Sequence, residues 1–68
     1  MNDDTFNMSI RKFLKMVGVS SQHEIEQAVA QALANGHLKG SEKLPVKMML
    51  TIDSAHLDIS FDGIIELE

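Results

Sequence analysis

The chain has 68 residues, with three Phe and no Trp, Tyr or Cys, and this length allows one domain with a small core. The absence of Cys excludes disulfides and thiolate zinc sites, and a formal net charge of −4 disfavours general nucleic-acid binding, which requires Lys and Arg. The acidic N-terminus lacks the apolar core of a signal peptide, and no apolar run approaches a membrane span, so we expect a cytoplasmic protein without a membrane partner.

A first amphipathic helix is predicted over residues 3–17. Asp3 or Asp4 is expected to cap its start, and Gly18 is expected to end it. Apolar residues recur at three- and four-residue spacing and form one face of the helix. They are Phe6, Ile10, Phe13, Leu14 and Val17.

A second helix is predicted over residues 21–35. Ser21 and Glu24 have the spacing of a capping box, and Gly36 can adopt the left-handed conformation that ends a helix. Because only three residues separate the two helices, we expect them to form a helical hairpin. The second apolar face consists of Ile25, Ala28, Val29, Ala32 and Leu33.

A helix, a short turn and a second helix also suggest a DNA-binding helix-turn-helix. The second helix, however, carries Glu24 and Glu26 and no Lys or Arg, and its apolar face is out of register with that motif. The sequence therefore disfavours nucleic acid as a partner. The basic side of the first helix remains the alternative surface for it, formed by Arg11, Lys12 and Lys15.

After a linker at 36–43, the apolar period changes to two, which predicts strands over residues 44–52 and 57–67. A four-residue loop at 53–56 aligns the apolar faces and places Met48 opposite Phe61 and Lys47 opposite Asp62. Asp62-Gly63 could make a second turn, but the unbroken alternation through it favours one long strand with Gly63 as a bulge or flat position.

Together these elements predict a single α+β domain over residues 1–68. Two strands alone are marginal in water, so we expect a two-layer ααββ arrangement, with the helical hairpin packed on one face of the antiparallel β-hairpin.

The segments FNMSIRKFLKMVGVSSQHEIEQAV, GHLKG and LPVKMMLTID resemble a family of short bacterial proteins of unknown function. The resemblance covers nearly the whole chain. It implies a free-standing bacterial protein, and because the family has no assigned activity it transfers no functional residue.

The sequence contains no set of residues typical of catalysis. There is no Ser-His-Asp order, phosphate-binding glycine loop or dinucleotide fingerprint, and His23, His37 and His56 are far apart, which suggests surface or capping roles. We therefore expect a protein that is not an enzyme and has no cofactor or metal.

Spare apolar residues on the outer face of the predicted hairpin suggest binding to a partner. Pro45, Met49 and Ile64 alternate with the residues of the core face, and flexible Met surfaces suit protein contacts. The leading hypothesis is a small interaction or accessory module that binds an unknown protein or self-associates through its sheet.

Overall fold

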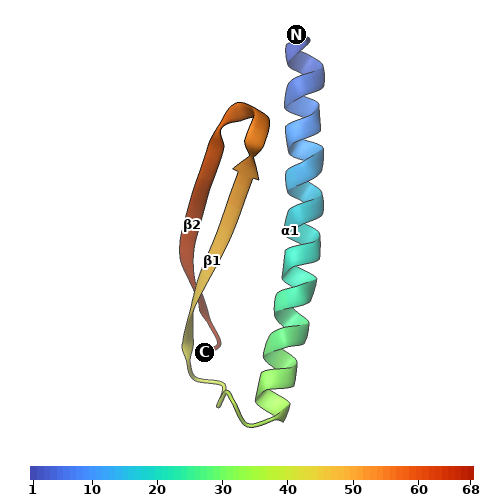
Figure 1. Ribbon diagram of the computed structural model, residues 1–68. Coiled ribbons are helices and arrows are strands. Elements are labelled where there is room, and N and C mark those ends of the chain that lie inside the picture. The colour runs from blue at the N-terminus through green and yellow to red at the C-terminus, as the bar shows by residue number, and fades with distance from the viewer. The chain divides into compact units, whose positions relative to one another are not determined.

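The computed structural model describes all residues 1–68, which form two compact units, Met1–His37 and Leu38–Glu68. The first unit contains the helix α1 (Asp3–Ala34). The second contains the strands β1 (Lys43–Ile52) and β2 (Leu57–Glu66), joined by the short 3-10 turn η1 (Asp53–Ala55) (Figure 1). The predicted α+β class is confirmed as one long helix followed by a two-stranded antiparallel hairpin.

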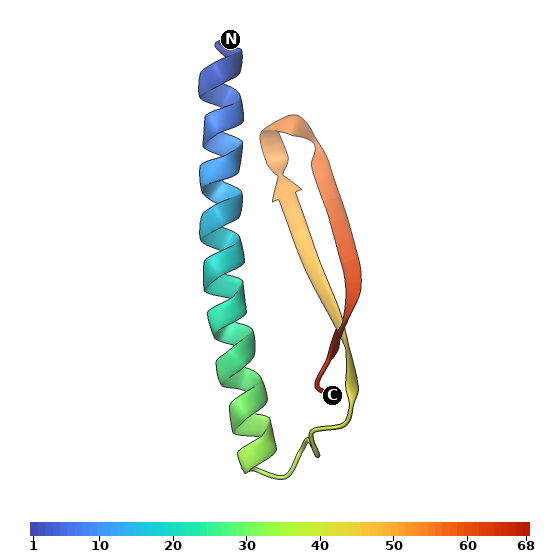
Figure 2. The same cartoon turned by 180° about the vertical axis from the view of Figure 1, so that it is seen from behind.

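The predicted helical hairpin is wrong, because α1 continues through the expected turn for 32 residues (Figure 2). Gly18 is not among the residues with positive φ, and Ser21 lies inside the helix rather than at its start. A glycine in a helix interior costs only about 1 kcal/mol relative to Ala. That penalty weakens a helix but does not end it, and the helix formers on both sides outweigh it.

The N-terminal cap of α1 is Asn2, not Asp3 or Asp4. Asn2 has extended backbone angles (φ −96°, ψ 111°), and its side-chain oxygen accepts a hydrogen bond from the Thr5 N–H at 3.1 Å. Asp3 and Asp4 lie one step later, in the first turn, where their charges still favour the positive end of the helix dipole.

The C-terminal end of α1 is the one expected from Gly36. This residue has φ 78°, and its N–H donates to the Leu33 carbonyl at 3.2 Å. The N–H of His37 donates to the Ala32 carbonyl at 2.9 Å, which completes a Schellman motif. The helix therefore ends at Ala34, followed by Asn35 as C-cap.

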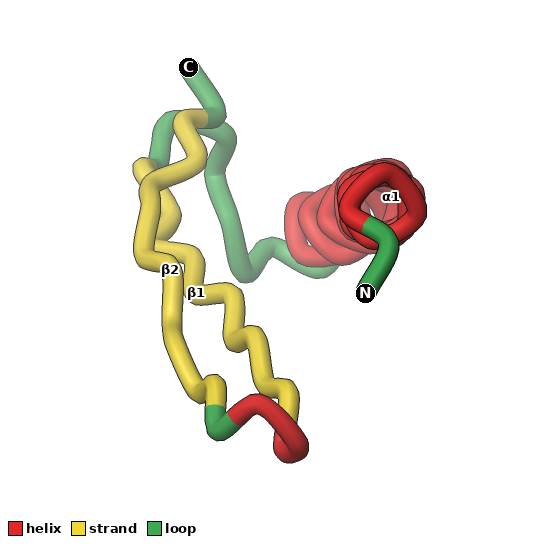
Figure 3. The backbone as a smooth tube through the Cα atoms, turned by 90° about the horizontal axis from the view of Figure 1, so that it is seen from above, coloured by secondary structure: helices red, strands yellow, loops and turns green.

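The predicted hairpin register is confirmed. Met48 pairs with Phe61 and Lys47 with Asp62, and Gly63 pairs regularly with Val46, so it is a flat position and not a bulge. The loop at 53–56 consists of η1 and His56, whose backbone is left-handed at φ 53° (Figure 3).

The two faces of the hairpin differ sharply in composition. One face, here called the inner face, carries nine apolar residues and Gly63. The other, the outer face, is mixed. No residue in either unit is buried, so neither unit contains a closed core. The inner-face residues are Leu44, Val46, Met48, Leu50, Ile52, Leu57, Ile59, Phe61, Gly63 and Ile65.

Candidate interaction surface

The outer face of the hairpin holds the three residues that the sequence analysis assigned to a partner surface. Pro45 lies directly opposite Ile64, as the register requires. Met49 lies two rows away, about 13 Å from Pro45 along the strand, and the Lys47–Asp62 row separates them. Met49 is 65% exposed and Ile64 is 66% exposed. The surface is therefore one apolar pair and one separate methionine, framed by polar side chains.

The free edges of the two strands are not equivalent. Leu67 N–H donates to the Glu42 carbonyl at 3.1 Å. Leu67 and Glu42 are therefore a hydrogen-bonded pair, and pairs along an antiparallel ladder alternate between hydrogen-bonded and non-hydrogen-bonded. It follows that the odd-numbered residues of β1 and the even-numbered residues of β2 point their N–H and C=O groups away from the other strand. Pro45, which has no N–H, therefore interrupts the free edge of β1 without costing a bond within the hairpin. The free edge of β2 has no such interruption.

The β2 side of the outer face is acidic. Its charged residues are Asp58, Asp62 and Glu66, and of these only Glu66 forms an ion pair, to Lys43 at 3.8 Å. If two copies paired antiparallel along β2 and centred on Asp62, Asp58 would oppose Glu66 and Asp62 would oppose its own copy. Like charges directly opposite each other destabilise a sheet. This edge suits a basic strand better than a second β2.

The basic residues proposed as the alternative, nucleic-acid surface share one side of α1. Arg11, Lys12 and Lys15 fall within an arc of about 100° on the helix. Asp4 and Glu26 lie on the same side by the same geometry, and Arg11 and Asp4 together line an open surface depression with Asn7 and Met8. The acids at both ends leave this side only weakly positive, and its role in nucleic-acid binding remains a prediction.

Glu42 forms the most extensive side-chain hydrogen-bond network in the chain, and the sequence analysis missed it. Its carboxylate accepts hydrogen bonds from the backbone N–H groups of Lys39 (2.8 and 3.1 Å), Gly40 (2.9 Å) and Ser41 (3.2 Å). These bonds, that of Lys39 foremost, lower the pKa of Glu42. The network fixes the linker just before β1. Its signal in the sequence was Gly40, two residues before Glu42. Gly40 has a positive φ of 101° in the structure.

Glu42→Gln is expected to loosen residues 39–42 and to remove a pH dependence. Because the folded-state pKa of Glu42 is lowered, its contribution is complete above the unfolded-state value of about 4.3 and is lost as pH falls through the lower folded value. An NMR titration should show the Lys39 and Gly40 amide shifts following this carboxyl. A midpoint at or above the ordinary glutamate pKa would contradict the network.

The whole chain, residues 1–68, matches the model of a family described as a family of unknown function, DUF6494. The protein belongs to this family. The match confirms the resemblance stated above to a family of unknown function. Comparison with curated proteins and with solved structures found no match.

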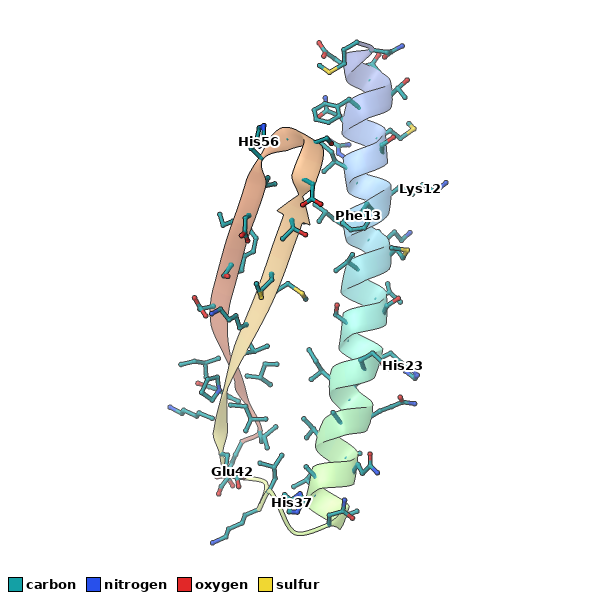
Figure 4. The ribbon with its side chains drawn as sticks, viewed as in Figure 1. Lys12, Phe13, His23, His37, Glu42 and His56 are labelled. Carbon is teal, nitrogen blue, oxygen red and sulfur yellow. The ribbon has the colours of Figure 1, made fainter.

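The histidines of this DUF6494 member are dispersed over the chain. His23 projects from the same side of α1 as Lys12, His37 follows the helix end, and His56 lies at the tip of the hairpin (Figure 4). No three His, Cys, Asp or Glu residues in the chain lie close enough together to hold a metal ion. No features of a catalytic site are evident, and α1 contains no stretch long and apolar enough to cross a bilayer.

Proposed function

We propose that this protein is a small interaction or accessory module without catalytic activity, and that the outer face of its hairpin binds a protein partner. The observation that carries the proposal is the exposure of Met49 and Ile64. The apolar residues that a hairpin needs for its own stability already lie on the inner face, so these two side chains are not required for folding. Exposed methionine and isoleucine beside a free strand edge suit a protein contact.

The chemistry of the outer face indicates the kind of partner. The free edge of β2 offers backbone N–H and C=O groups without interruption, and Asp58, Asp62 and Glu66 lie along it. An extended segment with Lys or Arg could add to this edge as a third strand and pair its charges with these acids. Self-association through the sheet is the other form of the proposal, and the opposed acids make it the less favourable one.

The test compares the proteins recovered on immobilised wild type with those recovered on a Met49→Ser, Ile64→Ser double variant. Both positions are exposed, so the fold should be kept. Loss of the apolar contacts should raise the Kd for the specific partner at least tenfold, which corresponds to about 1.4 kcal/mol of binding free energy, and should lower its recovery accordingly. The matched control is Thr51→Ser, on the same face but outside the apolar set. Equal recovery by all three proteins, or no specific recovery by wild type, would contradict the proposal.

A further inference from the structure

Asn35 and Gly36 form the only Asn-Gly pair in the chain, and both are exposed at the C-terminal end of α1. The other two asparagines, Asn2 and Asn7, are each followed by a residue with a side chain. After an asparagine, glycine lets its backbone nitrogen approach the side-chain amide most easily, because it has no Cβ to obstruct the approach. The helix end therefore places a reactive pair of residues where water reaches it.

Hydrogen bonding also separates Asn35 from the other asparagines. The side-chain oxygen of Asn2 accepts a hydrogen bond from the Thr5 N–H at 3.1 Å. The side-chain N–H of Asn7 donates to the Asp3 carbonyl at 2.9 Å. The side-chain amide of Asn35 forms no hydrogen bond within the protein. Of the three amides, it is the one that rotates without breaking a bond.

The reaction that this pair supports is deamidation through a succinimide. The backbone nitrogen of Gly36 loses its proton to solvent and attacks Cγ of Asn35. The N–Cγ bond forms, the Cγ–Nδ2 bond breaks, and Nδ2 takes up a proton and leaves as ammonia. Water then opens the ring, either at Cγ, which gives aspartate, or at the backbone carbonyl, which gives isoaspartate with the chain running through Cβ and Cγ. In sum, one water is consumed and one ammonia is released, with no change of oxidation state.

The closed helix end holds this pair in a conformation that does not react. A ψ of −2° at Asn35 eclipses the Gly36 nitrogen with the backbone nitrogen of Asn35, whereas the ring requires it to eclipse Cβ. The Gly36 N–H also donates to the Leu33 carbonyl at 3.2 Å, and the His37 N–H donates to the Ala32 carbonyl at 2.9 Å. Ring formation therefore requires the last turn of α1 to open, and helix ends open at low cost.

Asp62-Gly63 is the comparable pair in the hairpin, and it is better protected. An Asp-Gly pair forms the same ring by loss of water. Gly63 lies opposite Val46, at a hydrogen-bonded position of the ladder, so its N–H points toward β1. Attack by this nitrogen requires the two strands to separate, which is a larger opening than the fraying of one helical turn. We therefore expect Asn35 to react before Asp62.

Either product places a carboxylate at the C-cap of α1. This is the negative end of the helix dipole, and the last turn holds no basic residue to offset the added charge. Isoaspartate also adds one methylene to the backbone inside the Schellman motif, which displaces the His37 N–H from the Ala32 carbonyl. Both changes loosen the helix end and the start of the linker.

We propose that Asn35 is a site of spontaneous modification, which deamidates through a succinimide with Gly36 at a rate set by opening of the last turn of α1, and that the product keeps this turn open. Water is the only co-reactant. Because ammonia is lost, the change is irreversible and accumulates with the age of the molecule. The site is separate from the outer face of the hairpin, and the proposal does not depend on the partner proposed above.

Peptide mapping by mass spectrometry tests the site and its control by helix opening. The whole protein is incubated at neutral pH with and without urea, and the exchange of NH₂ for OH is followed at each asparagine. Asn35 should react before Asn2 and Asn7 in both solutions. Its rate should be at least about tenfold higher in urea, which opens the helix end. An earlier reaction at another asparagine, or equal rates with and without urea, would overturn the proposal.

Gly36→Ala is the matched control, because it separates ring formation from opening. Alanine is strained at a φ of 78°, so the helix end opens more often in this variant. In urea, where opening no longer limits the rate, its Cβ should slow deamidation of Asn35 by at least about fivefold relative to wild type. Equal rates of the two proteins in urea would show that the reaction does not pass through the nitrogen of residue 36, and would overturn the proposal.

Amide hydrogen exchange tests the effect of the product. Asn35→Asp supplies the charge without the longer backbone, and should speed exchange at Gly36 and His37 by about two- to fivefold, as expected for an anion at the negative end of a helix. High salt should reduce this difference. Wild type aged until isoaspartate has formed should exchange faster still at these amides. Exchange unchanged by ageing would contradict a product that keeps the turn open.

Discussion

Gly18→Pro should lower the free energy of unfolding by about 3 kcal/mol or more. Proline in a helix interior removes one backbone hydrogen bond, and its ring clashes with the carbonyl four residues earlier, here that of Leu14. The position is the middle of α1, so the substitution divides the helix into two halves. The measurement is urea unfolding followed by circular dichroism, at one fixed protein concentration because association would contribute to stability.

Alanine substitutions at Gly18 and Gly36 provide the matched control, because they are expected to change the free energy of unfolding in opposite directions. Gly18→Ala should stabilise the protein by about 0.5–1 kcal/mol, because Gly18 is helical and no atom lies within 4 Å of an added Cβ. Gly36→Ala should destabilise it by about 1–2 kcal/mol, because φ at Gly36 is 78°. If Gly18→Ala instead destabilised the protein, Gly18 would be a helix end, as the predicted helical hairpin requires.

Leu50→Asp should disrupt the hairpin, with an expected cost of about 2 kcal/mol. Leu50 is half-buried on the inner face, directly opposite Ile59. The substitution removes the apolar contribution of a leucine and places a charge among apolar neighbours. Amide hydrogen exchange along β2 is the readout, because it follows the opening of this pair of strands directly.

The control for Leu50→Asp is the same charge placed one residue earlier. Met49 lies on the outer face, opposite Ser60. Met49→Asp should therefore change the opening free energy measured by amide exchange along β2 by less than about 0.5 kcal/mol. Equal protection in the two variants would mean that the two faces of the hairpin do not differ as the register requires.

The hairpin was predictable from sequence because strand alternation is a long-range constraint. Four of the five inner-face residues from Leu44 to Ile52 lie opposite an apolar residue of the second strand, and only a loop of suitable length satisfies all of these pairs together. The apparent turn at Asp62-Gly63 failed this condition, and the structure indeed carries β2 straight through it.

The helix was harder to predict because its internal signals are local and weak. Gly18, Ser20 and Ser21 each lower the helix propensity of this segment by a small amount. The same residues could also end one helix and cap the next if the chain turned there. At the C-terminal end a comparable signal, Asn35-Gly36, does end the helix. Gly36 adopts a left-handed conformation there, and the residues after it are no longer helical. Propensity alone does not separate these two cases.

The candidate site shows the same division. The positions of Pro45, Met49 and Ile64 on one face followed from alternation, but the exposure of Met49 and Ile64 and the difference between the two strand edges are visible only in the structure. Glu42 was missed because its partners are backbone N–H groups, and a glycine two residues before an acid is only a weak signal for such a network.

The continuity of α1 through Gly18 is the central claim about this fold, because one helix replaces the expected helical hairpin, and backbone NMR tests it most directly. One helix requires positive ¹³Cα secondary shifts without a gap from Asp3 to Ala34, together with protected amides at Val19, Ser20 and Ser21. Shifts near random-coil values at Gly18–Ser20, with unprotected amides at the start of a second helix, would contradict it.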